Sequence, residues 1–344
     1  MKMTAERNYG VDLAKAIAIF LVVLTHVLQG GVDYPTSGAG LWTHAYVKGF
    51  ASCCVNLFAL VSGYVGVTGH PSLRKYFRLW LQVVVTGGIV TAFTRFVLGV
   101  PLEGIDYTHI VLPVTSAAYW YFTAYTGVYC FMPLLNAGLK ALDRRSALGV
   151  AAALFAVLSV SASVGARDVY GHVSGYSVIW LLVLYVFGGL VRLHLPRLPR
   201  LRWCVLAAAL LPTLTMAQDV LCASRPALAA KLSGRCLAGH YISPVVTLTA
   251  LALFLACLQY RAVSDRVRRT VVFLSSVSFG IYLFHNQSTL FHRYWKPHLE
   301  PLGRLCGENL ALWLACSFGL AVAVYVVCAL LEKGRQAVMR RLGV

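Results

Sequence analysis

The stretch Val11-Asp-Leu-Ala-Lys-Ala-Ile-Ala-Ile-Phe-Leu-Val-Val-Leu-Thr-His-Val-Leu28 is long and apolar enough to cross a bilayer as a helix. It nevertheless carries Asp12, Lys15 and His26, although each charge in hydrocarbon costs about 2.5 kcal/mol or more. In a helix Lys15 and His26 point in nearly the same direction, about 16 Å apart along the axis. Asp12 lies three residues before Lys15, close enough to pair with it. This face is therefore expected to look onto protein or a wet cavity rather than lipid.

The composition of the whole chain agrees with this stretch. Of its 344 residues, 59% are hydrophobic and 12% charged, and a soluble domain cannot bury that much apolar surface. The net charge of +18 invites a nucleic-acid partner, but the basic residues gather in short loops between apolar segments, which excludes that partner. We therefore expect an all-α fold, a polytopic transmembrane helical bundle in which residues 1–344 form a single membrane domain.

Ten apolar segments are long enough to be membrane spans, with boundaries good to a few residues. Pro212 is expected to kink the seventh of them. The predicted spans are residues 11–29, 42–67, 76–99, 117–138, 147–164, 176–193, 203–218, 241–259, 270–291 and 309–331.

The distribution of basic residues predicts the orientation in the membrane. The termini and the loops at 68–75, 139–146, 194–202 and 260–269, counted with the adjoining helix ends, hold 20 Lys and Arg residues. The alternate loops hold seven, and three lie within spans. Because cytoplasmic loops are the basic ones, both termini are predicted to be cytoplasmic, in a multi-pass protein of the cell (plasma or inner) membrane.

The ten cysteines show no CxxC pair and no metal-type spacing with histidine, so no metal is expected. Most of them lie inside apolar spans, where cysteine behaves as a small hydrophobe. Cys222 and Cys236 fall in a segment predicted to lie outside the cell membrane, where a disulfide between them is one option.

A second histidine lies in the ninth span, in the segment Ser278-Phe-Gly-Ile-Tyr-Leu-Phe-His285. Spans one and nine run in the same direction, and His26 and His285 each lie roughly 21–23 Å from the cytoplasmic edge. Two histidines at equal depth on parallel helices can share one cavity. The alternative is that each bonds a neighbouring helix in a structural role, but the ionisable face shared with Lys15 favours function.

Other polar and aromatic residues accompany these spans. Asn56 and Ser62 in the second span can form hydrogen bonds between helices, and a packing role is the simplest one for them. The fourth span opens with the aromatic segment Ala118-Tyr-Trp-Tyr-Phe-Thr-Ala-Tyr125, which predicts an aromatic, partly polar wall. Between these spans, Arg74, Lys75 and Arg78 form a basic cluster that is either a topology signal or a clamp for a phosphorylated ligand.

Several motifs, taken in order, resemble those of the acyltransferase 3 family of integral-membrane O-acyltransferases. Lysine at position 15 replaces the family's commoner arginine, and no extracellular esterase-like domain follows the last predicted span, so the membrane domain is expected to complete the transfer. The matching residues are Lys15 and His26, then Phe58, Ser62, Gly63 and Tyr64, then Lys75 and Arg78, then Trp120-Tyr-Phe and Pro133-Leu-Leu-Asn136, and finally Ser278 to His285.

The resemblance implies transfer of an acyl group, usually acetyl from acetyl-CoA, to a hydroxyl of a cell-surface glycan or lipid-linked sugar. His26 would act as a general base or form an acyl-histidine, and Lys15 would steer the donor or stabilise charge. His285 would hold the acceptor or relay a proton, while Arg74, Lys75 and Arg78 would bind acyl-CoA. The expected substrate pocket comprises Asp12, Asn56, Ser62, Trp120 and Tyr282.

A secondary transporter or exporter of a small molecule or polysaccharide precursor is the competing class, because buried Lys and His also mark substrate paths. The sequence shows no paired broken-helix repeats and few acidic residues within spans, which argues against a proton-coupled carrier. A purely structural protein would not need Lys15 and His26 at three-turn spacing. The acceptor, the acyl chain and the oligomeric state stay open at this point.

Overall fold

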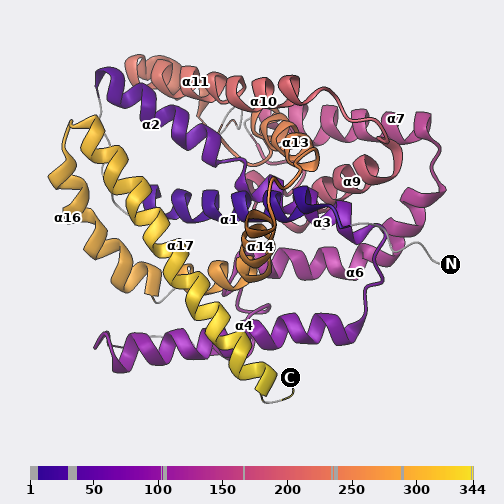
Figure 1. The fold of residues 1–344 in the computed structure, drawn as a ribbon. Coiled ribbons are helices and arrows are strands. Elements are labelled where there is room, and N and C mark those ends of the chain that lie inside the picture. The colour runs from indigo at the N-terminus through magenta and orange to yellow at the C-terminus, as the bar shows by residue number, and fades with distance from the viewer. Residues whose placement is uncertain are drawn as a thin grey trace.

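The computed structural model describes residues 7–29, 37–101, 103, 107–165, 167–233, 235, 239–287, 290–341 and 343. All regular elements among these residues are helices, arranged as one bundle (Figure 1). They are α1 Tyr9–Gln29, α2 Gly38–Ala51, α3 Cys54–Gly66, α4 Leu73–Phe96, α5 Thr108–Val111, α6 Trp120–Ala141, α7 Arg144–Phe155, η1 Ala156–Ser161, α8 Ala162–Val164, η2 Val173–Gly175, α9 Val178–His194, α10 Leu201–Leu210, α11 Pro212–Ser224, α12 Pro226–Leu232, α13 Pro244–Leu258, α14 Asp265–His285, η3 Phe291–Trp295, α16 Lys296–Cys306 and α17 Leu310–Arg341.

The prediction of an all-helical membrane protein is confirmed. Within the described part of the chain, seven helical segments are long and apolar enough to cross a membrane. Helices α9 and α13 are apolar but shorter, and α6 is 22 residues long with an aromatic, polar start. Every predicted span overlaps a helix, while the total of ten spans and the orientation stay predictions.

Three predicted spans differ in detail from the observed helices. The second is two helices, α2 and α3, separated at Ser52 and Cys53. The ninth ends at His285 rather than at residue 291, because the backbone of Asn286 leaves the helical region. At Pro212 the expected break is present, since α10 ends at Leu210 and α11 begins at the proline, which has no N–H for the helix ladder.

Helix α1 runs through the middle of the bundle (Figure 1) and packs against α2, α3, α13, α14 and α17. Its buried positions include Ala14, Ala16 and Ala18, whose small side chains let the neighbouring helices approach closely. Because protein surrounds it, α1 can carry polar groups that lipid would not tolerate.

A glycine contact holds α3 tightly against α9. A side chain at Gly63 would collide with the carbonyl oxygen of Tyr185, and one at Gly188 would collide with that of Leu60. Only glycine permits this close backbone approach, which anchors the helix that forms one wall of the site described below.

Cys222 lies in α11 and is partly exposed. Cys236 lies outside the described residues, so the option of a disulfide between the two stays a prediction.

Candidate active site

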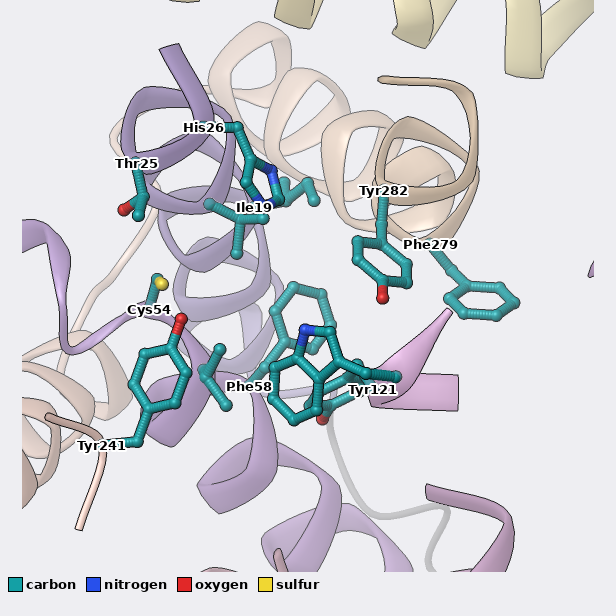
Figure 2. A pocket seen from close by; sticks show the side chains of 12 residues that line it. Ile19, Thr25, His26, Cys54, Phe58, Tyr121, Tyr241, Phe279 and Tyr282 are labelled. Carbon is teal, nitrogen blue, oxygen red and sulfur yellow. The ribbon is translucent and has the colours of Figure 1, made fainter. Parts of the chain in front are cut away.

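His26 and His285 meet at the centre of the candidate site. Their helices, α1 and α14, pack together, and His26 Nδ1 lies 2.8 Å from His285 Nε2. The expectation that the two histidines share one location is confirmed. Figure 2 shows the His26 ring directed toward a group of aromatic side chains.

Hydrogen bonding defines the tautomers of this pair. His285 Nδ1 lies 2.6 Å from the carbonyl oxygen of Ile281, one turn earlier in α14. A carbonyl only accepts, so His285 Nδ1 carries the hydrogen, and Nε2 of the neutral ring is an acceptor. His26 Nδ1 therefore donates to it, which leaves His26 Nε2 with a lone pair. A general base or a nucleophile needs such a lone pair.

The His26 ring forms part of a cavity of about 40 Å³, which we term the aromatic pocket (Figure 2). Trp120 and Tyr282, both predicted as pocket residues, line it. Tyr241 comes from the loop before α13 and had no signal in the sequence. The complete lining is Ile19, Val22, Thr25, His26, Cys54, Val55, Phe58, Trp120, Tyr121, Tyr241, Phe279 and Tyr282.

Asn56 and Ser62 do not line this pocket but form hydrogen bonds to the backbone of two residues that do. The fully buried Asn56 donates to the carbonyl oxygen of Tyr241 at 2.7 Å and accepts from Trp180 Nε1 at 3.2 Å. Ser62 Oγ donates to the carbonyl oxygen of Phe58, one turn earlier, at 3.0 Å. Asn56 therefore fixes the loop that presents Tyr241, and the assignment of Asn56 and Ser62 to the substrate pocket stays a prediction.

The acidic group of α1 has a different partner from the expected one. The Asp12 carboxylate accepts from Arg7 Nε at 2.8 Å and from Arg7 Nη2 at 2.9 Å. Arg7 therefore binds both oxygens of Asp12, for which the sequence offered Lys15 as a partner, and Asp12 lies near the start of α1, outside the aromatic pocket. Lys15 is partly buried one turn further along α1 and does not line this pocket either.

A second cavity, the polar pocket, adjoins the aromatic pocket and shares Thr25 and Tyr241 with it. Its volume is about 250 Å³, and Tyr176 packs against Tyr241 with ring centroids 4.9 Å apart. The complete lining is Thr25, Leu28, Gln29, His44, Lys48, Ala51, Ser52, Tyr176, Gly239, His240 and Tyr241.

The positive charge of Lys48 in the polar pocket is balanced by a neighbouring carboxylate. Lys48 Nζ pairs with the Asp219 carboxylate at 2.9 Å. Burial lowers the pKa of His240, Lys48 lowers it further and Asp219 opposes the shift, so the imidazole is neutral near pH 7. Such a surface suits a polar, hydroxyl-rich ligand.

A third cavity, the arginine pocket, opens between α4 and α17 with a volume of about 380 Å³. Glu332 is fully buried beside it, and Arg335 Nε and Nη2 each donate to the Glu332 carboxylate at 2.7 Å. Gln82 and Gln336 donate to the same carboxylate at 3.2 and 2.8 Å. The lining is Arg78, Leu81, Gln82, Arg335, Gln336, Met339 and Arg340.

Of the three residues in the predicted basic cluster, only Arg78 lines the arginine pocket. Arg78 joins Arg335 and Arg340 from the far end of the chain. Arg74 is exposed outside the pocket, and Lys75 Nζ donates to the carbonyl oxygen of His70 at 2.8 Å. Arg78 is thus grouped with basic residues of α17, and the role of Arg74 and Lys75 in donor binding stays a prediction.

Among the described residues, no group of three or more His, Cys, Asp or Glu side chains is placed to hold a metal ion.

The fold and the site define a multi-pass membrane protein with a pair of hydrogen-bonded histidines enclosed between helices. The family model described as an acyltransferase domain, that of acyltransferase 3, matches residues 8–332. The chain belongs to this family, which makes it a membrane acyltransferase in general terms and confirms the resemblance of its motifs. Comparison with curated proteins and with solved structures finds no match.

Proposed function

We propose that this protein is an O-acyltransferase that moves an acyl group from cytoplasmic acyl-CoA, with acetyl-CoA as the natural candidate, to a hydroxyl of a cell-surface or lipid-linked glycan. The observation that carries the proposal is the His26–His285 pair, whose tautomers leave a lone pair on His26 Nε2 at the aromatic pocket. Family membership supports acyl transfer in general.

The arginine pocket is the proposed site for the phosphates of the donor, because guanidinium groups bind phosphate through strong charge-assisted hydrogen bonds. Gln336 donates to the carbonyl oxygen of Ser276 in α14 at 3.2 Å. Ser276 lies nine residues before His285, about 14 Å along the same helix. An extended pantetheine arm can bridge that length and bring its thioester to the aromatic pocket.

The polar pocket is the proposed site for the acceptor. It meets the aromatic pocket at Thr25 and Tyr241, so a bound hydroxyl can approach His26 from that side. Trp120 lies against Tyr176 with ring centroids 4.6 Å apart, and the two rings form with Tyr241 an aromatic surface on which a sugar ring can stack.

In the proposed reaction His26 Nε2 takes the proton of the acceptor hydroxyl while the oxygen attacks the thioester carbonyl. The tetrahedral intermediate then collapses, the C–S bond breaks, and the proton passes from His26 to the departing thiolate of CoA. Throughout the reaction His285 Nε2 accepts a hydrogen bond from His26 Nδ1–H, and this bond holds the reactive Nε2 of His26 in place. Direct attack by His26 Nε2 on the thioester, giving an acyl-histidine, would use the same arrangement.

Membrane vesicles test this function. Inside-out vesicles from the native cell, given acetyl-CoA labelled in its acetyl group, should incorporate label into their glycan fraction, whereas vesicles from a deletion strain should not. Sealed right-side-out vesicles should incorporate none, because the donor binds at the cytoplasmic face. Equal labelling of wild-type and deletion vesicles would overturn the proposed function, and labelling of right-side-out vesicles would overturn the orientation.

If the arginine pocket binds the donor, loss of its arginines should weaken the binding of acetyl-CoA. Arg78→Ala and Arg340→Ala should each raise the KM for acetyl-CoA about tenfold or more with little change in kcat, because each removes a charge-assisted bond made equally before and during reaction. Arg74→Ala is the matched control, since Arg74 is exposed on the same helix outside the pocket. Initial rates at varied acetyl-CoA measure both constants. An equal rise in KM for all three variants would remove the pocket from the mechanism.

A further inference from the structure

A small cavity lies beside the histidine pair, separate from the aromatic pocket; we term it the side pocket. His26 and His285 form part of its lining, and its volume is about 20 Å³. The remaining walls are apolar and include Trp295 of η3, Leu299 of α16 and Val324 of α17. Leu299 and Val324 are buried and belong to the packed interior, while Trp295 is half-buried.

The cavities are arranged around the last turns of α1. Ile19 and Val22 face the aromatic pocket, while Val23 and Val27 face the side pocket, about 100° further around the helix. His26 belongs to the lining of both, so its ring stands at their boundary. Thr25 lines both the aromatic pocket and the polar pocket, on the side of α1 away from Val23 and Val27.

We propose that the side pocket binds the alkyl part of the donor's acyl group, and that Trp295 and Leu299 limit its length to that of an acetyl group. This assignment rests on the proposed function, in which the aromatic pocket takes the pantetheine arm and the polar pocket takes the acceptor. The acyl tail continues beyond the carbonyl carbon that faces His26, and the side pocket is a small apolar space that adjoins the same histidine.

The limit on acyl-chain length follows from the volume of the side pocket. A volume of about 20 Å³ holds roughly one water-sized group, and a methyl group is of that size. A propionyl or butyryl chain adds one or two methylenes, which would press against Trp295 and Leu299. Packed interiors resist such insertion because neighbouring side chains must leave their preferred rotamers.

Chain-length preference tests the assignment. The protein in lipid vesicles is given acetyl-, propionyl- or butyryl-CoA together with the glycan fraction of the native membrane, and release of CoA thiol is followed. Wild type should favour acetyl-CoA by about tenfold or more in kcat/KM for each added methylene. Trp295→Ala and Leu299→Ala should raise the butyryl-to-acetyl ratio of kcat/KM by a similar factor. Leu299→Val, a smaller change, should shift it less in the same direction.

The matched control is Leu305→Ala, because Leu305 lies on the same helix as Leu299 but is 75% exposed. Its chain-length preference should equal that of wild type. If the protein transfers acetyl groups and neither Trp295→Ala nor Leu299→Val changes the preference, the side pocket is not the acyl site while the proposed function stands. If wild type releases no CoA thiol from any of the three donors, the proposed function itself fails.

Discussion

Replacing His26 with glutamine is expected to lower the kcat of acyl transfer by about 10²–10⁴-fold, the usual contribution of a positioned acid–base group. Glutamine preserves much of the size and hydrogen bonding of histidine, but its amide cannot accept a proton at neutral pH. His26→Ala should be at least as impaired. Initial rates at saturating labelled acetyl-CoA, normalised to the amount of protein in the membrane, measure the effect.

The variant should still fold, because the lost hydrogen bond between α1 and α14 is worth only about 0.6–2 kcal/mol. His298→Gln provides the control for the same substitution at an exposed histidine of α16, and it should keep wild-type kcat. Near-normal kcat for His26→Gln would make His26 a packing residue and would remove the basis of the proposed mechanism.

Substitutions at His285 are expected to separate a positioning role from a role as the base. His285→Leu removes the acceptor that holds His26 Nδ1–H and should lower kcat by up to about 10⁴-fold, as loss of a tautomer-fixing partner does in hydrolytic triads. His285→Gln offers an amide oxygen to the same hydrogen and should recover a large part of the loss.

The pH dependence of kcat/KM gives a second readout for His285. If His26 is the base, the His285→Gln enzyme should still show a single ascending limb as His26 loses its proton. Equal loss of kcat in the Gln and Leu variants, with disappearance of that limb, would instead identify His285 as the group that exchanges the proton.

Hydropathy and charge alone are enough to predict the helical, membrane-embedded class of this protein, since the bilayer imposes both the length and the apolar character of each span. The meeting of His26 and His285 was also predictable, because the sequence places both at one predicted depth on spans predicted to run in the same direction. The family motifs could also be read directly from the sequence, because each is a local pattern on one helix or its adjoining loop.

Contacts between distant segments could not be predicted in this way. Helical periodicity tells which side chains share a face, but it does not tell which helices become neighbours. Arg78 therefore lines one pocket with Arg340 from the opposite end of the chain, and Tyr241 reaches the aromatic pocket from a loop. The side pocket exists only because Trp295, Leu299 and Val324, from segments near the end of the chain, come to lie beside the C-terminal end of α1. Its size is therefore set by tertiary packing.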